Sequence, residues 1–215
     1  MNPIRIVIGT EPRTEIARKV LEFSILENCK EEIAFYPIMG DDQKDRGTLG
    51  QGTGFSFLRF SIPEMFNYQG RAIYLDADML VLSDISELWN VKSENEDNIV
   101  WCKYGNEKKE EAETSMMVID CEKAKDKLKG ISEIQEYIKD DVDRKKYRNI
   151  MKLRYLEPRP TELSRWWNTM DKGCIYSKPE DFKNKKAKLL HYTNVRMQPW
   201  YVPEHPCSDI WGEWL

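Results

Sequence analysis

The sequence predicts a single α/β domain, and three features of its 215 residues carry this prediction. Residues 4–8 form a β-branched run that ends at Gly9 and is typical of a buried strand. Pro12 follows closely and suits the first turn of a helix, which completes a strand–turn–helix unit. A second apolar run, 72–75, leads into acidic residues at the strand end where α/β folds place ligands.

The first half of the chain alternates strand and helix patterns. Apolar residues after Pro12 recur at helical spacing, namely Ile16, Val20, Phe23 and Ile25 or Leu26. Residues 33–38 predict a second strand, and 55–67 a helix interrupted near Pro63. Between them, 41–54 holds four glycines but lacks the Gly-Lys-Ser/Thr ending of a phosphate-binding loop, so it is interpreted as a surface loop or a lid.

The second half predicts strands at 98–102 and 115–119 and helices at 121–129 and 131–140. A mixed charge run at 107–113 is interpreted as a solvated loop. Neither a repeat nor a linker divides the chain. We therefore expect one domain over 1–215, with an irregular tail from about residue 197 that is rich in aromatic residues and proline.

Composition argues against several classes of protein. The net charge of -4 argues against a broad electrostatic grip on nucleic acid. No apolar run reaches membrane-spanning length, and the N-terminus does not resemble a signal peptide. Five dispersed cysteines without a C-x-x-C pair suit reduced thiols. We therefore expect a soluble cytoplasmic protein without a nucleic-acid partner or a transmembrane segment.

Asp76-Ala77-Asp78 is the main candidate for chemistry, because it directly follows the strand expected at 72–75. Alternate residues of a strand share a face, so both carboxylates would point the same way. Two such oxygen ligands can hold a divalent ion that bridges a diphosphate. When a nucleotide sugar reacts, its diphosphate leaves, and a metal neutralises the charge that develops. Asp-x-Asp alone is common in surface turns, but its place behind an apolar strand favours a metal site.

His191 is the second candidate, one of two histidines in the chain. It follows an apolar approach at 188–190 and precedes polar and cationic residues and Pro199-Trp200. A lone histidine after a strand more often packs or lies at the surface, but this polar surrounding favours a ligand. Two carboxylates and an imidazole suit Mn²⁺ better than Ca²⁺, with Mg²⁺ as an alternative.

The stretch 70–81, followed by Asp84-Ile85 and Leu88-Trp89, resembles glycosyltransferase family 8, the glycogenin and bacterial galactosyltransferase family. Residues 191–200 resemble the terminal motif of that family, and weaker resemblances lie at 57–63 and 114–118. The resemblance implies the GT-A fold, a Rossmann-like mixed sheet flanked by helices. It also implies metal-dependent transfer of a hexose from a UDP-sugar to an unknown acceptor, with retention of anomeric configuration.

The resemblance implies roles for individual residues. Asp76, Asp78 and His191 would bind the metal. The residues expected to hold the nucleotide sugar are Gly9, Thr10, Glu11, Arg13, Arg59, Arg71, Leu75, Asp76, Ala77, Asp78, Ser115, Arg196 and Gln198. Asp78, Trp167 and Asn168 are the catalytic candidates, with Glu162 another candidate near the sugar. Trp166 is interpreted as core, and a surface salt bridge is an equal alternative for Arg71.

Two departures from the family keep other functions open. Where the family carries a lysine before Pro-Trp, this chain has Gln198, and Arg196 is expected to supply the cation instead. Thr114 and Met116 replace an asparagine and a glycine of the middle motif. A nucleotide-sugar-binding protein with weak catalysis is therefore one alternative. An NDP-sugar nucleotidyltransferase is another, although the turn after Gly9 is poor in the glycines and arginines that it would need.

Overall fold

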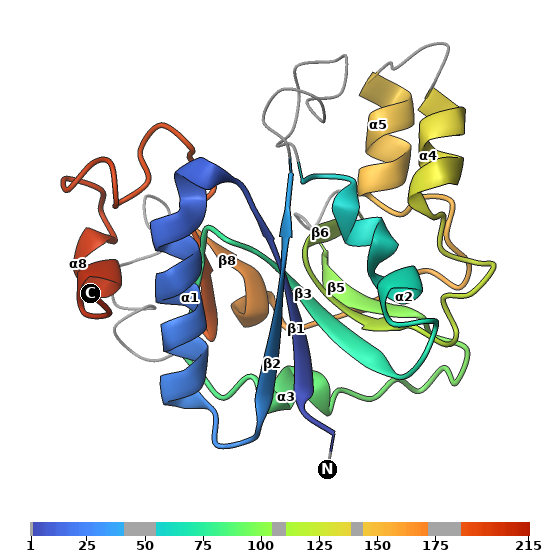
Figure 1. Cartoon of the computed structure of the whole chain (residues 1–215), viewed down its shortest axis with the longest axis horizontal. Coiled ribbons are helices and arrows are strands. Elements are labelled where there is room, and N and C mark those ends of the chain that lie inside the picture. The colour runs from blue at the N-terminus through green and yellow to red at the C-terminus, as the bar shows by residue number, and fades with distance from the viewer. Residues whose placement is uncertain (1, 41–54, 105–110, 139–143, 172–185) are drawn as a thin grey trace.

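The computed structural model describes residues 2–40, 55–104, 111–138, 144–171 and 186–215. A six-stranded mixed sheet forms its centre, in the order β2-β1-β3-β6-β5-β7 (Figure 1). Its strands are β1 (Ile4–Thr10), β2 (Ile33–Met39), β3 (Arg71–Asp76), β5 (Val100–Tyr104), β6 (Ala112–Asp120) and β7 (Thr161–Glu162). The first three strands are parallel, and β6 runs antiparallel to both β3 and β5.

A second, three-stranded sheet lies beside the first. It has the order β4-β9-β8, formed by β4 (Met79–Val81), β9 (Leu189–His191) and β8 (Thr169–Met170). Helix α1 (Glu15–Asn28) packs on it, and the Ser24 hydroxyl accepts a hydrogen bond from the amide of Val81. The short helix α8 (Ser208–Gly212) lies beside α1 in Figure 1, where Trp211 joins the same apolar cluster as Val20.

The remaining helices are short. They are α2 (Ile62–Met65), α3 (Ser86–Trp89), α4 (Ile131–Ile138) and α5 (Arg144–Met151), with 3₁₀ turns η1 (Pro12–Thr14), η2 (Leu58–Ser61) and η3 (Arg165–Asn168). Helices α4 and α5 lie side by side at one end of the large sheet (Figure 1). None of the helices in these described ranges is both long and apolar enough to cross a membrane.

Strand β3 is buried on both faces, which explains why its sequence is continuously apolar instead of alternating. Ile73 and Leu75 face the core that contains Leu21 of α1. Ala72 and Tyr74 face the other core. A strand so enclosed is a rigid base for the acidic residues at its end.

Several expected elements differ from the observed ones. Residues 121–128 form a series of turns instead of a helix, and Asp126 there has a φ of 63° that helical backbone does not allow. Pro63 does not interrupt a helix but lies in the first turn of α2, where its missing N–H costs nothing. Part of the run 107–113 belongs to β6, because Ala112 and Glu113 pair with β5.

Helix α1 buries only part of the apolar set expected from the sequence. Ala17, Val20, Leu21, Ser24 and Ile25 are buried, whereas Ile16, Phe23 and Leu26 are exposed. Positions 17, 21, 24 and 25 share one face at helical spacing, and the small Ala17 and Ser24 permit close packing on β4. The sequence pattern therefore identified Val20 and Ile25 correctly but not the other apolar positions, because small residues complete the buried face.

The cysteines only partly meet the expectation of reduced thiols. Cys29, Cys102 and Cys121 are free and buried. Cys207, however, is disulfide-bonded, so the expectation is wrong for this residue. The tail from residue 197 is mostly irregular, as expected, but it includes α8.

Candidate active site

The parallel pairing of β1 with β3 places the ends of both strands at one edge of the sheet. Gly9 lies opposite Asp76 in this register, and the amide of Ala77 donates to the carbonyl of Gly9 at 2.9 Å. A side chain at position 9 would clash, because a Cβ there would lie 2.2 Å from the hydroxyl of Tyr74 and 2.6 Å from the ring of Phe55. Gly9 therefore allows Tyr74 and Phe55 to close over the end of β1.

The second sheet brings His191 to the same edge. Met79 pairs with His191 where β4 meets β9, and the amide of Tyr192 donates to the carbonyl of Asp78 at 2.9 Å. As a result, ligand atoms of Asp76, Asp78 and His191 all lie within 4.8 Å of one another. The structure thus assembles the three expected metal ligands from two sheets.

Asp78 has one carboxylate oxygen in an environment that suits a cation. Its Oδ2 accepts a hydrogen bond from Gln198 Nε2 at 3.1 Å. Its Oδ1 is buried, has no hydrogen-bond partner among the described residues, and lies 3.2 Å from His191 Nε2. Two buried lone-pair donors at this distance repel unless a cation or a proton lies with them. The donor set of two carboxylates and an imidazole therefore fits a divalent metal.

Asn168 sets the orientation of the His191 ring. Its Nδ2 donates to Ser115 Oγ at 2.9 Å, so its Oδ1 faces His191 Nδ1 at 3.0 Å. The proton of the neutral imidazole then lies on Nδ1, which leaves the Nε2 lone pair directed at Asp78. Burial opposes the charged form of the ring, but the neighbouring Asp78 carboxylate outweighs this effect and raises the pKa of His191.

Arg59 holds the carboxylate of Asp76 in position. Its Nη2 donates to Asp76 Oδ1 at 3.1 Å, and the hydroxyl of Tyr74 donates to the same oxygen at 2.5 Å. The other guanidinium nitrogens donate to the carbonyls of Ser56 and Thr114. Burial raises the pKa of Asp76, and Arg59 opposes that rise. Arg59 is thus buried behind the ligand and holds it in place.

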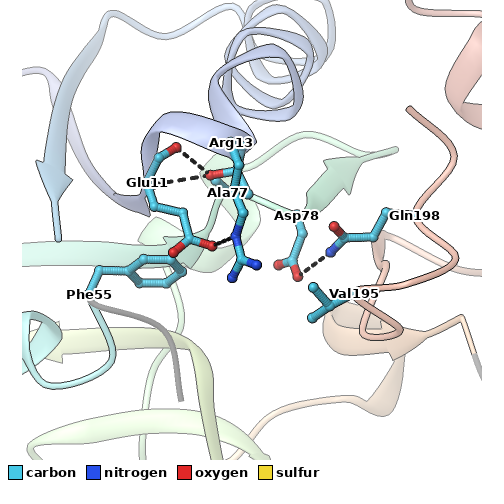
Figure 2. A pocket seen from close by; sticks show the side chains of 8 residues that line it. Glu11, Arg13, Phe55, Ala77, Asp78, Val195 and Gln198 are labelled. Carbon is cyan, nitrogen blue, oxygen red and sulfur yellow. Dashed lines mark hydrogen bonds and ion pairs between the residues drawn. The ribbon is translucent and has the colours of Figure 1, made fainter. Parts of the chain in front are cut away.

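A small, partly open hollow lies beside Asp78 (Figure 2). Its lining residues are Glu11, Arg13, Thr14, Phe55, Ala77, Asp78, Val195 and Gln198. Figure 2 shows Glu11 and Arg13 on one wall and Asp78 with Gln198 on the other. The hollow therefore lies between the turn after β1 and the segment after β9, next to the candidate metal ligand Asp78.

Gln198 and Arg196 differ in their surroundings. Gln198 is only 2% exposed, and its Nε2 donates to both Asp78 and the carbonyl of Tyr192. Arg196 is exposed and makes neither a hydrogen bond nor an ion pair with any described residue. It does not line the pocket.

Several expected site residues lie elsewhere or have other roles. Arg71 begins β3, at the opposite end from Asp76, where it donates to the carbonyls of Trp89 and Val91 and lies over the Trp101 ring. Arg71 therefore lies away from Asp76 and Asp78 and outside the pocket lining. Trp167 is 4% exposed and packs in the core, whereas Trp166 is less buried, so the core residue of the pair is Trp167 and not Trp166 as expected.

Thr10 and Leu75 are fully buried, and with Gly9 they build the strand ends instead of lining the pocket. Glu162 is exposed on β7. The glycine-bearing segment 41–54 and the acidic residues of 139–143 lie outside the described residues.

Sequence reasoning missed some contributors. Thr14, Phe55 and Val195 line the pocket, and Tyr74 bonds to Asp76. Tyr74 could have been noticed, because it precedes Asp76 by two positions and shares its face of the strand. Asp171 was also missed: it accepts hydrogen bonds from Thr193 and Asn194 and so fixes the segment after His191.

Comparison with known proteins agrees with this arrangement. A family model described as Glycosyl transferase family 8 matches residues 13–202. Protein CDI of Arabidopsis thaliana is 38% identical over 92 residues, which cover 40% of this chain and 36% of that protein. The bifunctional glycosyltransferase WbbM has a similar structure, with a TM-score of 0.74 at 15% identity, over 99% of this chain and 49% of WbbM.

The galactosyltransferase LgtC, solved in complex with donor and acceptor sugar analogs, is similar over 98% of this chain and 95% of its own, with a TM-score of 0.72 at 13% identity. These likenesses show the GT-A fold expected from the sequence, here as a central mixed sheet with helices. Because the family model matches most of its length, the chain belongs to glycosyl transferase family 8.

Proposed function

We propose that this chain is a metal-dependent glycosyltransferase that moves a hexose from a UDP-sugar to an acceptor with retention of configuration, and that it uses Mn²⁺ or, as second choice, Mg²⁺. The observation that carries the proposal is the cluster of Asp76, Asp78 and His191 beside a pocket, in a family 8 chain. The donor analog named in the LgtC complex supports a nucleotide-sugar substrate for this fold.

Neighbouring side chains would orient the three metal-binding residues before the ion binds. Arg59 orients Asp76, Gln198 orients Asp78, and Asn168 orients His191. A divalent ion bound there would neutralise the charge that develops on the departing diphosphate. Asp76 is paired with Arg59, and Glu11 with Arg13, whereas the side chains beside Asp78 are His191 and Gln198, and neither is a permanent cation. A nucleoside diphosphate should therefore bind well only together with the ion.

The carboxylates of the described pocket lining are Glu11, which is paired with Arg13, and Asp78, a metal ligand. We therefore propose a front-face reaction without a covalent intermediate on the enzyme. The bond from the anomeric carbon to the phosphate oxygen breaks, the acceptor oxygen bonds on the same face, and the departing phosphate takes the acceptor proton.

Calorimetric titration with UDP, with and without Mn²⁺, tests binding, and release of UDP from UDP-hexoses tests catalysis. We expect Asp78→Asn to lose both Mn²⁺-dependent UDP binding and turnover. Asp126→Asn is the matched control, because Asp126 is exposed in a turn with a positive φ that asparagine tolerates. Full turnover by Asp78→Asn would overturn the assignment.

A nucleotide-sugar-binding protein is the second candidate. The amide of Gln198 favours it, because this uncharged side chain already donates to Asp78 and stands where the family carries a lysine. UDP binding without any release of UDP from the donor sugars would favour this candidate over the enzyme.

A further inference from the structure

Arg13 occupies an unusual place in the pocket. It is the one cationic side chain in the described pocket lining, and it faces the wall that carries Asp78 (Figure 2). Its side chain is 38% exposed, so the guanidinium reaches the open space of the pocket. A nucleoside diphosphate bound to an ion at Asp78 would have its phosphate oxygens within this same hollow.

Only the Nε side of the Arg13 guanidinium is bonded to another described residue. Its Nε donates to Glu11 Oε1, and Glu11 is almost fully buried. Its two Nη nitrogens donate no hydrogen bond to any described residue. Arginine binds phosphate through two parallel N–H groups, and the two Nη groups provide such a fork. Glu11 thus restricts the side chain while the binding edge stays available.

The backbone around Arg13 is also restrained. Pro12 fixes the first residue of η1, and Glu11 and Thr14 form a reciprocal capping box around the turn. The hydroxyl of Tyr201, from the C-terminal tail, donates to the carbonyl of Arg13 at 2.5 Å. A cation fixed in this way loses little conformational freedom on binding, which favours affinity.

We propose that Arg13 binds the diphosphate of the donor on the wall opposite Asp78, with Glu11 as the residue that orients its guanidinium. This inference rests on the proposed function. It assigns to Arg13 the phosphate contact that the sequence had assigned to Arg196, a side chain outside the pocket lining. Gln198 is then a positioning residue for Asp78.

The test compares UDP, UMP and uridine by calorimetric titration in saturating Mn²⁺. We expect Arg13→Ala to weaken UDP binding about 10- to 100-fold, because it loses charge-assisted hydrogen bonds. Uridine binding should not change, so the preference for UDP over uridine should fall by the same factor. Arg13→Lys keeps the charge but not the fork, and we expect an intermediate loss.

Lys19→Ala is the matched control, because it removes one positive charge from a side chain that is 63% exposed on α1. We expect Lys19→Ala and Arg196→Ala to bind UDP like the wild type. Unchanged Mn²⁺ affinity in Arg13→Ala would show that the variant is folded. UDP binding by Arg13→Ala and Arg13→Lys at wild-type strength overturns the inference, and so does a loss confined to Arg196→Ala. A wild-type protein that binds no UDP with Mn²⁺ instead overturns the proposed function itself.

Discussion

His191 Nδ1 and Asn168 Oδ1 lie 3.0 Å apart, and this contact directs the other imidazole nitrogen at Asp78. Asn168 is fully buried, so it reaches the chemistry through His191 and not through a substrate. We therefore propose that Asn168, expected from the sequence to be catalytic, is a positioning residue that orients the proposed metal ligand His191.

Replacing Asn168 should weaken metal binding. We expect Asn168→Ala to reduce Mn²⁺ affinity by about 10- to 100-fold, the usual effect of losing a partner that orients a histidine ligand. Calorimetric titration with Mn²⁺ alone measures it. Asn90→Ala, at an exposed helix end, is the control and should bind Mn²⁺ normally. Equal affinities for both variants would contradict the role given to Asn168.

A methyl group at Gly9 should destabilise the strand end. We expect Gly9→Ala to lower the free energy of unfolding by about 1–3 kcal/mol, because its Cβ would overlap Tyr74 and Phe55. Urea denaturation measures this change. At Gly130 a Cβ would meet nothing within 4 Å, so Gly130→Ala should be nearly neutral. Equal stability of the two variants would show that the end of β1 can relax.

Arg59 should matter more than a surface arginine. Arg59→Leu leaves the buried carboxylate of Asp76 without its ion-pair partner. We expect it to lower the free energy of unfolding by about 3–5 kcal/mol. Arg154→Leu breaks an ion pair with Glu111 in which the arginine side chain is 38% exposed. This substitution should lower the free energy of unfolding by less than about 1 kcal/mol. Thermal and urea unfolding compare the two. A loss in Arg59→Leu no larger than in Arg154→Leu would be inconsistent with the buried pair.

Asp171 should give the protein an acid-sensitive contact. Burial opposes ionisation, but hydrogen bonds from Thr193, Asn194 and His205 outweigh it and lower the pKa of Asp171. A lowered pKa stabilises the fold above the unfolded pKa of about 3.9, and this contribution disappears as pH falls through the folded value. Urea unfolding from pH 7 to pH 3 should therefore show that the difference in free energy of unfolding between wild type and Asp171→Asn becomes smaller at low pH. A difference in free energy of unfolding that does not depend on pH would exclude a stabilising role for ionised Asp171.

The sequence predicted what depends on neighbours along the chain. The strands around Gly9 and Asp76 were recognised because apolar runs and their ends are local patterns. The ligand set was also predicted, because His191 follows a strand in the same way as Asp76 does. The structure shows that the side chains of Asp76, Asp78 and His191 meet, as a metal site requires.

What depends on tertiary packing could not be read locally. Which of Trp166 and Trp167 enters the core depends on the orientation of η3, and adjacent residues in sequence look equivalent. Arg71 was expected at the site because of the family resemblance, but an extended strand of six residues separates it from Asp76 by about 17 Å. The inward turn of Gln198 likewise depends on Asp78, 120 positions away.

The pairing of β4 with β9 makes an ion at this site a removable cross-link between distant parts of the chain. The unfolded chain cannot present Asp78 and His191 together, so the ion should bind the folded state selectively and raise its melting temperature. Bringing Asp78 and His191 together closes a long loop of the chain and costs entropy, and ion binding in the folded state would offset this cost. Chelation should then loosen β9 and the tail behind it before it disturbs the large sheet, so protease sensitivity after residue 189 would report on metal occupancy.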